Sequence, residues 1–170
     1  MGLIANYQLV NDQELEKIMD PDLDPEELLE DLEELAEEQE VFLDIDKMWD
    51  VLHFVLTGVS SDEPPADNPL SEAIVGVISA EDMDDYVAVT EKDRVAEILS
   101  ALKSFDMEEA LGKFDMEACK EAGLYPNIWD KDDEGLADSL LDEIETCYNG
   151  LVTFYTMVLE AEGNVVVTIL

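Results

Sequence analysis

Positive charge is scarce in this sequence. Its 8 lysine and arginine residues stand against 45 aspartate and glutamate residues, so the formal net charge at pH 7 is −37. Proteins that bind nucleic acid regardless of sequence, or anionic lipid, need lysine and arginine to neutralise phosphate groups. We therefore expect neither nucleic acid nor a membrane as a partner. The same imbalance favours solubility and fast, salt-sensitive encounter with a basic protein partner.

Cysteine and histidine are scarce as well. The chain has two cysteines, Cys119 and Cys147, and a single histidine, His53. These residues do not supply the four ligands of a structural zinc site, and separate thiols in a cytosolic protein are reduced by default. The sequence also lacks a phosphate, nucleotide or nucleophile motif, so we expect no metal and no cofactor.

One segment has part of a calcium-binding pattern. Residues 130–135, D-K-D-D-E-G, resemble the start of a calcium loop with oxygen ligands from Asp130, Asp132 and Glu134. The twelfth position of such a loop requires a bidentate glutamate, and Leu141 stands there. A complete EF-hand is therefore excluded. Weak, non-specific binding of divalent ions is the alternative that the surplus of carboxylates leaves open.

Long apolar runs and a leader pattern are absent too. No run approaches the roughly 20 apolar residues that a membrane helix needs, and no basic segment followed by an apolar one opens the chain. We therefore expect a cytoplasmic protein. With 170 residues, of which 47% are hydrophobic, the chain can bury a sizeable core. We expect residues 1–170 to form a single domain.

Helical patterns outnumber strand patterns along the chain. The run at 151–159 is rich in strand-forming residues and could pair with 165–170, but the apolar spacing from Leu136 favours one long helix to about Glu162. This balance predicts an α+β fold with several helices around a small mixed β-sheet. Strands are expected at 1–10, 41–46, 86–90 and 165–170, and the other helices at 12–19, 24–39, 107–114, 116–122 and after a capping box at Thr90.

The segment Leu43 to Gly58 combines a strand-like start, a helix that is apolar on two ridges and a glycine stop. Asp44 or Asp46 can cap the start of this helix with a side-chain oxygen. Gly58 stands where a left-handed residue would end it. A short helix with two apolar ridges is a core helix that other elements cover.

The polar residues of this helix fall in one stripe, formed by Asp46, Asp50, His53 and Thr57. We expect the stripe to be the side that faces water or a ligand. Asp50 lies one turn before His53, so a hydrogen bond between them would raise the imidazole pKa. The functional interpretation is a general base or a proton-sensing switch. The structural interpretation, a solvated edge with a satisfied histidine, is preferred because no nucleophile candidate is near.

Aromatic residues in an irregular segment extend the same hypothesis. Tyr125 and Trp129 flank Pro126 in L-Y-P-N-I-W-D. Loop aromatics more often anchor the loop to the core than stack on a ligand. If the protein is an enzyme or binds a small ligand, the catalytic residues are His53 and Asp50, and the ligand-binding residues are Asp46, Trp49, Tyr125 and Trp129.

The helix expected at 24–39 has an almost entirely acidic outer side. Leu28, Leu29, Leu32 and Leu35 mark its buried side. The acidic side is either a solvated surface or a docking surface for a basic protein, and repulsion between its charges costs a few tenths of a kcal/mol per pair. We call the following residues the acidic face: Glu26, Glu27, Glu30, Glu33, Glu34 and Glu37.

Four segments in order along the chain resemble the YfbM-like bacterial proteins, the domain-of-unknown-function family 1877. The segments are M-G-L-I-A-N-Y at the start, K-M-W-D-V-L-H-F-V-L-T-G ending at Gly58, N-P-L-S-E-A-I-V-G around Ile74, and L-Y-P-N-I-W-D at Leu124. One departure is Val77, where a second glycine is expected after Gly76. The resemblance implies a small cytosolic α+β domain and implies no activity. The matching positions are Gly2, Asn6, Trp49, His53, Gly58, Tyr125, Pro126 and Trp129.

Two functional hypotheses follow, besides the binding of divalent ions that the surplus of carboxylates leaves open. The first is a non-catalytic interaction protein that docks a basic partner on the acidic face, for example an inhibitor or immunity-like protein that neutralises a basic nuclease. The alternative is an enzyme or small-ligand-binding protein centred on His53. The charge imbalance and the lack of catalytic motifs favour the first.

Overall fold

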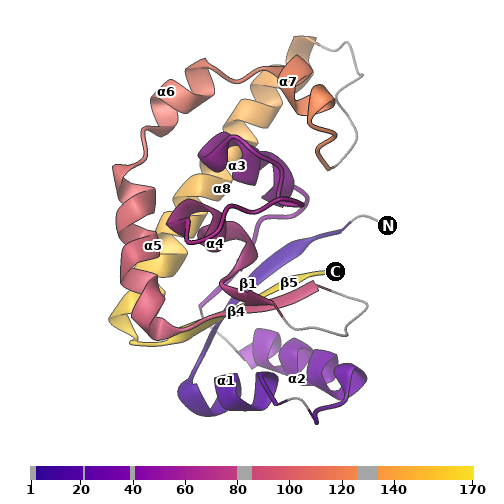
Figure 1. Ribbon diagram of the computed structural model, residues 1–170, viewed down its shortest axis with the longest axis vertical. Helices are drawn as coiled ribbons and strands as arrows, with labels where there is room; N and C mark the ends of the chain where they lie inside the picture. Colours follow the sequence, from indigo (N-terminus) through magenta and orange to yellow (C-terminus); the bar gives the residue numbers. More distant parts are fainter. Residues whose placement is uncertain (1–2, 21, 39–40, 80–85, 126–133) are drawn as a thin grey trace.

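The computed structural model describes residues 3–20, 22–38, 41–79, 86–125 and 134–170. These residues form a sheet with helices on both sides (Figure 1). Its strand order is β2-β1-β5-β4-β3, so the last strand of the chain lies in the middle. The strands are β1 (Ala5–Val10), β2 (Phe42–Asp44), β3 (Ile78–Ser79), β4 (Tyr86–Thr90) and β5 (Asn164–Ile169).

All four strand pairings are antiparallel in the described residues. β1 pairs with β5 from Ala5 opposite Ile169 to Val10 opposite Asn164. The α+β class is therefore confirmed, but the expectation of a mixed sheet is wrong. β5 lacks hydrophobic alternation because helices cover both of its faces and every residue of it is buried, and not because its neighbours are parallel.

Eight helices are present in the described ranges, and they form two layers (Figure 1). None of these described helices combines the length and hydrophobicity that crossing a membrane requires. α8 confirms the long helix expected at the C-terminal end, including 151–159. The helices are α1 (Asp12–Ile18), α2 (Pro25–Glu38), α3 (Trp49–Thr57), α4 (Pro69–Val75), α5 (Lys92–Ser104), α6 (Met107–Gly112), α7 (Met116–Glu121) and α8 (Glu134–Glu160).

Alternate residues of β5 point to the two layers. Val165 and Val167 belong to the larger core, which α3, α4, α5 and α8 cover, whereas Val166 belongs to a smaller core under α1 and α2. In the smaller core, Leu28 and Leu32 are buried as the sequence predicted. α1 and α2 therefore form a separate layer on one face of the sheet, and it is this layer that presents the acidic face.

Two predicted helix starts are wrong. α3 begins at Trp49, after a turn in which the Asp46 N–H donates to Asp44 Oδ1 at 2.7 Å, so neither aspartate caps the helix. α5 begins at Lys92, and Thr90 belongs to β4 instead of capping it. The backbone N–H of Lys92 donates to Asn164 Oδ1 at 2.8 Å. A side chain 72 residues away therefore takes the capping role, which local spacing does not reveal.

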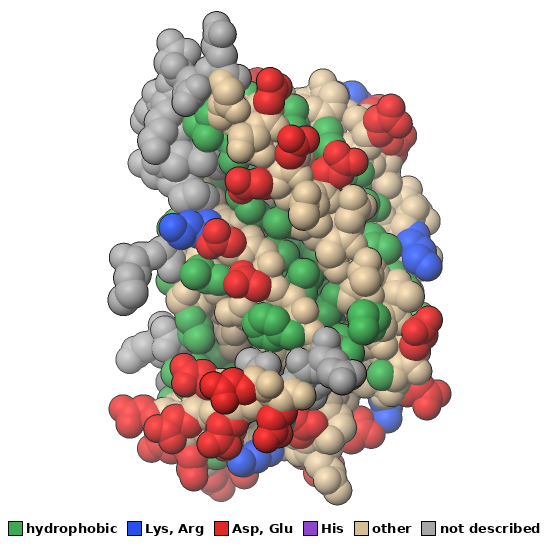
Figure 2. Space-filling model, turned by 180° about the vertical axis from the view of Figure 1, so that it is seen from behind, with side chains coloured by type: hydrophobic (Ala, Val, Ile, Leu, Met, Phe, Trp, Pro, Cys, Tyr) green, Lys and Arg blue, Asp and Glu red, His purple; other side chains and the backbone are tan. Residues whose placement is uncertain are grey.

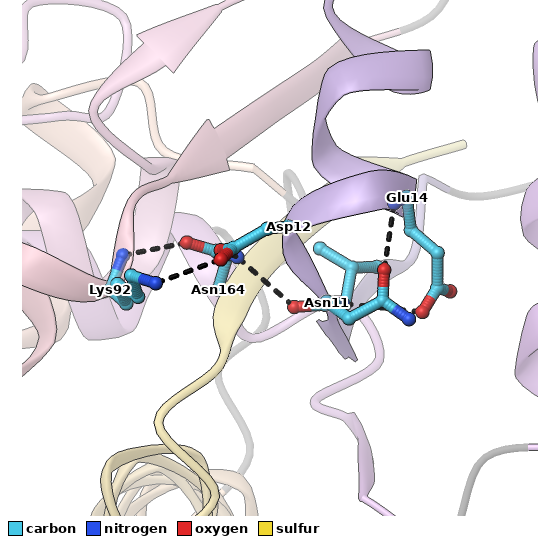
Figure 3. Close-up of polar contacts among 6 residues, drawn as sticks. Asn11, Asp12, Glu14, Lys92 and Asn164 are labelled. Carbon is cyan, nitrogen blue, oxygen red and sulfur yellow. Dashed lines mark hydrogen bonds and ion pairs between the residues drawn. The ribbon is translucent and has the colours of Figure 1, made fainter.

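Asn164 links four elements (Figure 3). Besides accepting from Lys92, its Nδ2 donates to the Val10 carbonyl at 3.3 Å and to Asp12 Oδ1 at 3.0 Å. The Lys92 ammonium donates to Asp12 Oδ2 at 2.8 Å. These contacts lower the pKa of Asp12, chiefly through the Asn164 hydrogen bond and then through Lys92. The Asn164 amide thus ties β1 and β5 to the starts of α1 and α5.

Candidate functional site

The two middle residues of the polar stripe face inward. Asp50 has 3% of its surface exposed and His53 has none, so the expectation that the stripe faces water or a ligand is wrong for these two residues. Asp46 is exposed and Thr57 is half-buried. The chain reverses after Gly58, which is left-handed at φ 83° as the sequence predicted, and residues 59–61 then cover the stripe. The partly exposed side of α3 carries Phe54 and Val55 instead.

His53 is held by hydrogen bonds at both ring nitrogens. Nδ1 lies 2.8 Å from the Val59 carbonyl oxygen, and Nε2 lies 2.7 Å from Ser71 Oγ. Because a carbonyl only accepts, Nδ1 carries the proton, and Nε2 of the neutral ring accepts from the Ser71 hydroxyl. Burial lowers the pKa of His53, and the Val59 hydrogen bond and the charge of Asp50 oppose this only in part. The predicted rise in pKa is therefore wrong.

Asp50 uses both carboxylate oxygens on groups other than His53. Oδ1 accepts from Ser60 Oγ at 3.1 Å, and from the backbone N–H and Oγ of Ser61 at 2.9 and 2.8 Å. Oδ2 accepts from the Tyr125 N–H at 2.8 Å. Asp50 thus fastens α3 to the loop after Gly58 and to the chain after α7. This buried carboxylate is stabilised by four donors and is not oriented as a partner of the imidazole.

Tyr125 and Trp49 stack on each other and hold the start of the chain. Their ring centroids are 5.2 Å apart at an interplanar angle of 19°. Trp49 Nε1 donates to the Leu3 carbonyl at 3.1 Å, and the Leu3 N–H donates to Tyr125 Oη at 2.6 Å. These contacts agree with the anchoring role that loop aromatics more often have. Asp46 is exposed on the turn before α3, and Trp129 lies outside the described residues.

Ser71 is a potential nucleophile beside His53 Nε2 that sequence reasoning missed. The Thr57 hydroxyl also lies near the ring, 3.2 Å from Nδ1, but it donates to the His53 carbonyl. A hydroxyl donating to an imidazole is the first pair of a nucleophilic site. However, Ser71 is 1% exposed and His53 is 0% exposed, so neither can touch a substrate in this conformation. No local signal could have paired them, because α4 brings Ser71 to His53 across 18 residues of sequence.

The predictions about metal binding can be compared with the structure only within the described residues. Among the described residues, no group of three or more histidine, cysteine, aspartate or glutamate side chains is arranged to hold an ion. The calcium-like ligands Asp130 and Asp132 lie outside the described residues. Cys119 and Cys147 are free thiols. Burial is the main cause that raises the pKa of each thiol to about 11, which makes both weak nucleophiles and metal ligands at neutral pH.

The acidic face is fully on the surface. All six of its glutamates are exposed on α2, and acidic side chains crowd the end of the molecule that α1 and α2 form (Figure 2). Residues 11–40 contain 15 acidic residues and one basic residue, Lys17. Lys17 forms an ion pair with Asp31. Within the described part of the chain, no ion pair includes a glutamate of the acidic face.

A groove runs between α1 and α2 beside the acidic face. Its volume is about 180 Å³. Its apolar lining comes from Ile18, Leu28, Leu32 and Leu35, and its charged lining comes from Glu14, Lys17, Asp31, Glu34 and Glu38.

Together these features define an α+β protein with an antiparallel sheet between two helical layers, one of which is strongly acidic. The chain belongs to the family described as Domain of unknown function (DUF1877), whose model matches residues 1–168. The resemblance drawn from the four sequence segments is therefore confirmed.

Two comparisons with individual proteins agree with the family. The chain is 29% identical to Protein YfbM of Escherichia coli strain K12 over 171 residues, covering 100% of this chain and 99% of the relative. It is also similar to the crystal structure of YfbM from Escherichia coli, described as a protein of unknown function. That likeness has a TM-score of 0.79 at 26% sequence identity and covers 98% of this chain and 99% of that one. The comparisons identify a YfbM-like domain and attach no activity to it.

Proposed function

We propose that this protein is a single-domain, cytoplasmic binding module that docks a basic protein partner on its acidic face. The observation that carries the proposal is the exposure of six glutamates on one side of α2 without a paired cation in the described chain. Like charges at helical spacing destabilise the helix slightly. A lysine- or arginine-rich partner would remove that repulsion on binding.

The groove beside the acidic face strengthens the proposal. Charge gives fast encounter and orientation, but lasting affinity needs apolar contact at the centre of an interface. Leu28, Leu32 and Leu35 supply an apolar floor, and Glu34 and Glu38 stand at its edge. A basic segment with apolar side chains fits this combination. An inhibitor or immunity-like protein that neutralises a basic nuclease is one concrete form.

The His53-centred alternative has less support. His53 and Ser71 are buried, and all four donors to Asp50 come from the protein itself. These contacts describe a polar cluster that fastens α3, the loop after Gly58 and the chain at Tyr125. Catalysis would require the loop at 59–61 to move away.

The experiment compares three tagged proteins in affinity capture from a lysate of the organism that encodes the chain. They are the wild type, a variant with glutamine at all six positions of the acidic face, and a control with the same charge change elsewhere. The control replaces exposed carboxylates of α7 and α8 with the corresponding amides, at Glu117, Glu121, Asp138, Asp142, Glu143 and Glu145.

We expect a basic protein to be retained by the wild type and by the control, and to be lost from the acidic-face variant. Quantitative mass spectrometry measures the retained amount. Equal loss from both variants would show that total charge, and not the acidic face, holds the partner. Equal retention by all three would remove the acidic face from the interaction.

A further inference from the structure

α6 and α7 lie at the end of the molecule away from α1 and α2 (Figure 1). A second cavity lies beside these two helices. Its volume is about 500 Å³, and it lies between α3, the end of α5, α6 and the start of α7. Sites for small organic molecules have volumes of roughly 300–1,000 Å³. The cavity is therefore large enough for such a ligand and is separate from the acidic face.

Three phenylalanine side chains form part of the wall of this cavity. Phe54 of α3, Phe105 after α5 and Phe114 after α6 all line it, and each is partly buried against the core. Phe105 packs against Tyr148, with ring centroids 6.4 Å apart. The Tyr148 hydroxyl donates to the Leu102 carbonyl. Phe105 is thus held against α8, and Tyr148 of α8 is in turn tied to α5.

The charged groups of the cavity give it a net negative charge. Asp106, Glu109 and Asp115 line it together with one cation, Lys113. The Lys113 ammonium donates to Glu109 at 2.7 Å, so this pair neutralises itself. Asp106 and Asp115 accept the N–H groups of Glu109 and Glu117 through Oδ1, each at 3.0 Å. Two carboxylates beside the aromatic rings therefore have no cation of the lining left to balance them.

We propose that this cavity binds a small organic cation with an aromatic or apolar body, such as a substituted ammonium ion. The faces of aromatic rings attract cations, and the attraction increases as the cation loses water. Asp106 and Asp115 add charge complementarity at the rim. The same two carboxylates repel an anion of equal size.

The proposal is tested by calorimetric titration of the full chain with benzyltrimethylammonium, and with 3-phenylpropionate as the anionic counterpart, at about 0.15 M salt. We expect saturable binding of the cation and none of the anion. In NMR spectra, the cation should shift the amide signals of residues 104–118 and of Phe54 and Val55. Lack of saturation below about 5 mM, or equal binding of the anion, would overturn the proposal.

Charge variants separate this site from the general acidity of the chain. The double variant Asp106→Asn and Asp115→Asn keeps both helix caps, because asparagine caps as well as aspartate does. It should lower the affinity for the cation about tenfold. Phe114→Leu keeps apolar volume while removing one ring, and it should lower the affinity for the cation about threefold.

The matched control is Glu26→Gln with Glu30→Gln, which removes two charges from the acidic face and should leave the affinity unchanged. If that control weakened binding as much as the cavity variant, overall charge would be holding the cation and the site would be excluded. If only a lysine- and arginine-rich peptide bound the cavity, and benzyltrimethylammonium did not, the assignment to a small molecule would be wrong. Circular dichroism verifies that each variant is folded.

Discussion

At the scale of single residues, burial decides what His53 and Asp50 can do. The sequence places them one turn apart on a polar stripe, which is the pattern of a base and its orienting carboxylate. In the fold, His53 binds Val59 and Ser71, and Asp50 binds the loop and Tyr125. Both side chains have their hydrogen bonds satisfied within the protein. Their main contribution is therefore to the stability of the fold.

Replacement of His53 by glutamine is expected to lower the free energy of unfolding at pH 7 by about 2–3 kcal/mol, because it disturbs two buried hydrogen bonds. Chemical denaturation followed by circular dichroism measures the change. Asn149→Gln, an exposed change on α8, serves as the control and should have little effect. Unchanged stability in the His53 variant would show that the histidine is not part of the packed core.

The pH dependence of His53 follows from the direction of its pKa. The pKa is lowered in the fold from the ordinary value of 6.5, so below that value the unfolded chain binds a proton that the folded chain does not. The contribution of His53 is therefore complete above pH 6.5 and is lost as pH falls toward the folded-state pKa. Between pH 7 and pH 5, the wild type should lose more stability than the glutamine variant. A parallel loss in the two proteins would contradict a neutral buried imidazole.

At the scale of elements, the apolar spacing predicted most helices and strands, but their long-range caps were not predictable. α2, α5 and α8 follow the expected periodicity, because one side of each must reach a core. The start of α5 depends on Asn164, which β5 brings beside it, and the cover over the α3 stripe depends on Ser60 and Ser61. These partners are distant in sequence or lie in a loop without periodicity, so no spacing along the chain reveals them.

Asn164→Ala is expected to lower the free energy of unfolding by about 2 kcal/mol, because it removes the cap of α5 and leaves buried groups without partners. The side chain of Asn68 is a local cap of α4, because it accepts from the Leu70 N–H. Asn68→Ala removes this cap and should lower the free energy of unfolding by only about 1 kcal/mol. Urea denaturation compares the two. Equal losses would mean that Asn164 does no more than a local cap.

The Asn164 variant should also change the titration of Asp12. The Asn164 hydrogen bond is the main cause that lowers the pKa of Asp12 from 3.8, so the pKa should rise in Asn164→Ala. A lowered carboxyl pKa contributes stability that is present above pH 3.8 and is lost as pH falls through the folded-state value. The variant should therefore lose less stability in acid than the wild type does. NMR titration of the Asp12 carboxyl measures the pKa directly.

Two glycines of the connecting turns should respond differently to substitution. Gly76 has φ 76° and ψ 179°, a conformation that is essentially restricted to glycine, and an added Cβ would lie 2.8 Å from the Ala88 Cβ. Gly58 has φ 83° but open space around the Cβ position. We expect Gly58→Ala to cost about 1 kcal/mol and Gly76→Ala about 3 kcal/mol or more. Thermal unfolding measures both losses of stability. A larger loss in Gly58→Ala than in Gly76→Ala would contradict the expectation.

At the scale of the whole molecule, charge repulsion acts against the folded state. A formal net charge of −37 destabilises a compact chain, and salt screens the repulsion. Raising the salt concentration from about 0.02 to about 0.5 M should therefore raise the melting temperature by about 5 °C or more. The variant with six glutamines on the acidic face should melt higher at low salt and respond less. A melting temperature independent of salt would contradict this view.

The central claim is that the acidic face of α2 is a docking surface for a basic protein. Its most direct test is the affinity of the purified captured partner for the wild type, for the acidic-face variant and for the α7–α8 control, measured by calorimetry at several salt concentrations. At about 0.05 M salt the acidic-face variant should bind at least tenfold more weakly than the other two, and the difference should shrink at about 0.5 M. Equal affinities for all three proteins at low salt would contradict the claim.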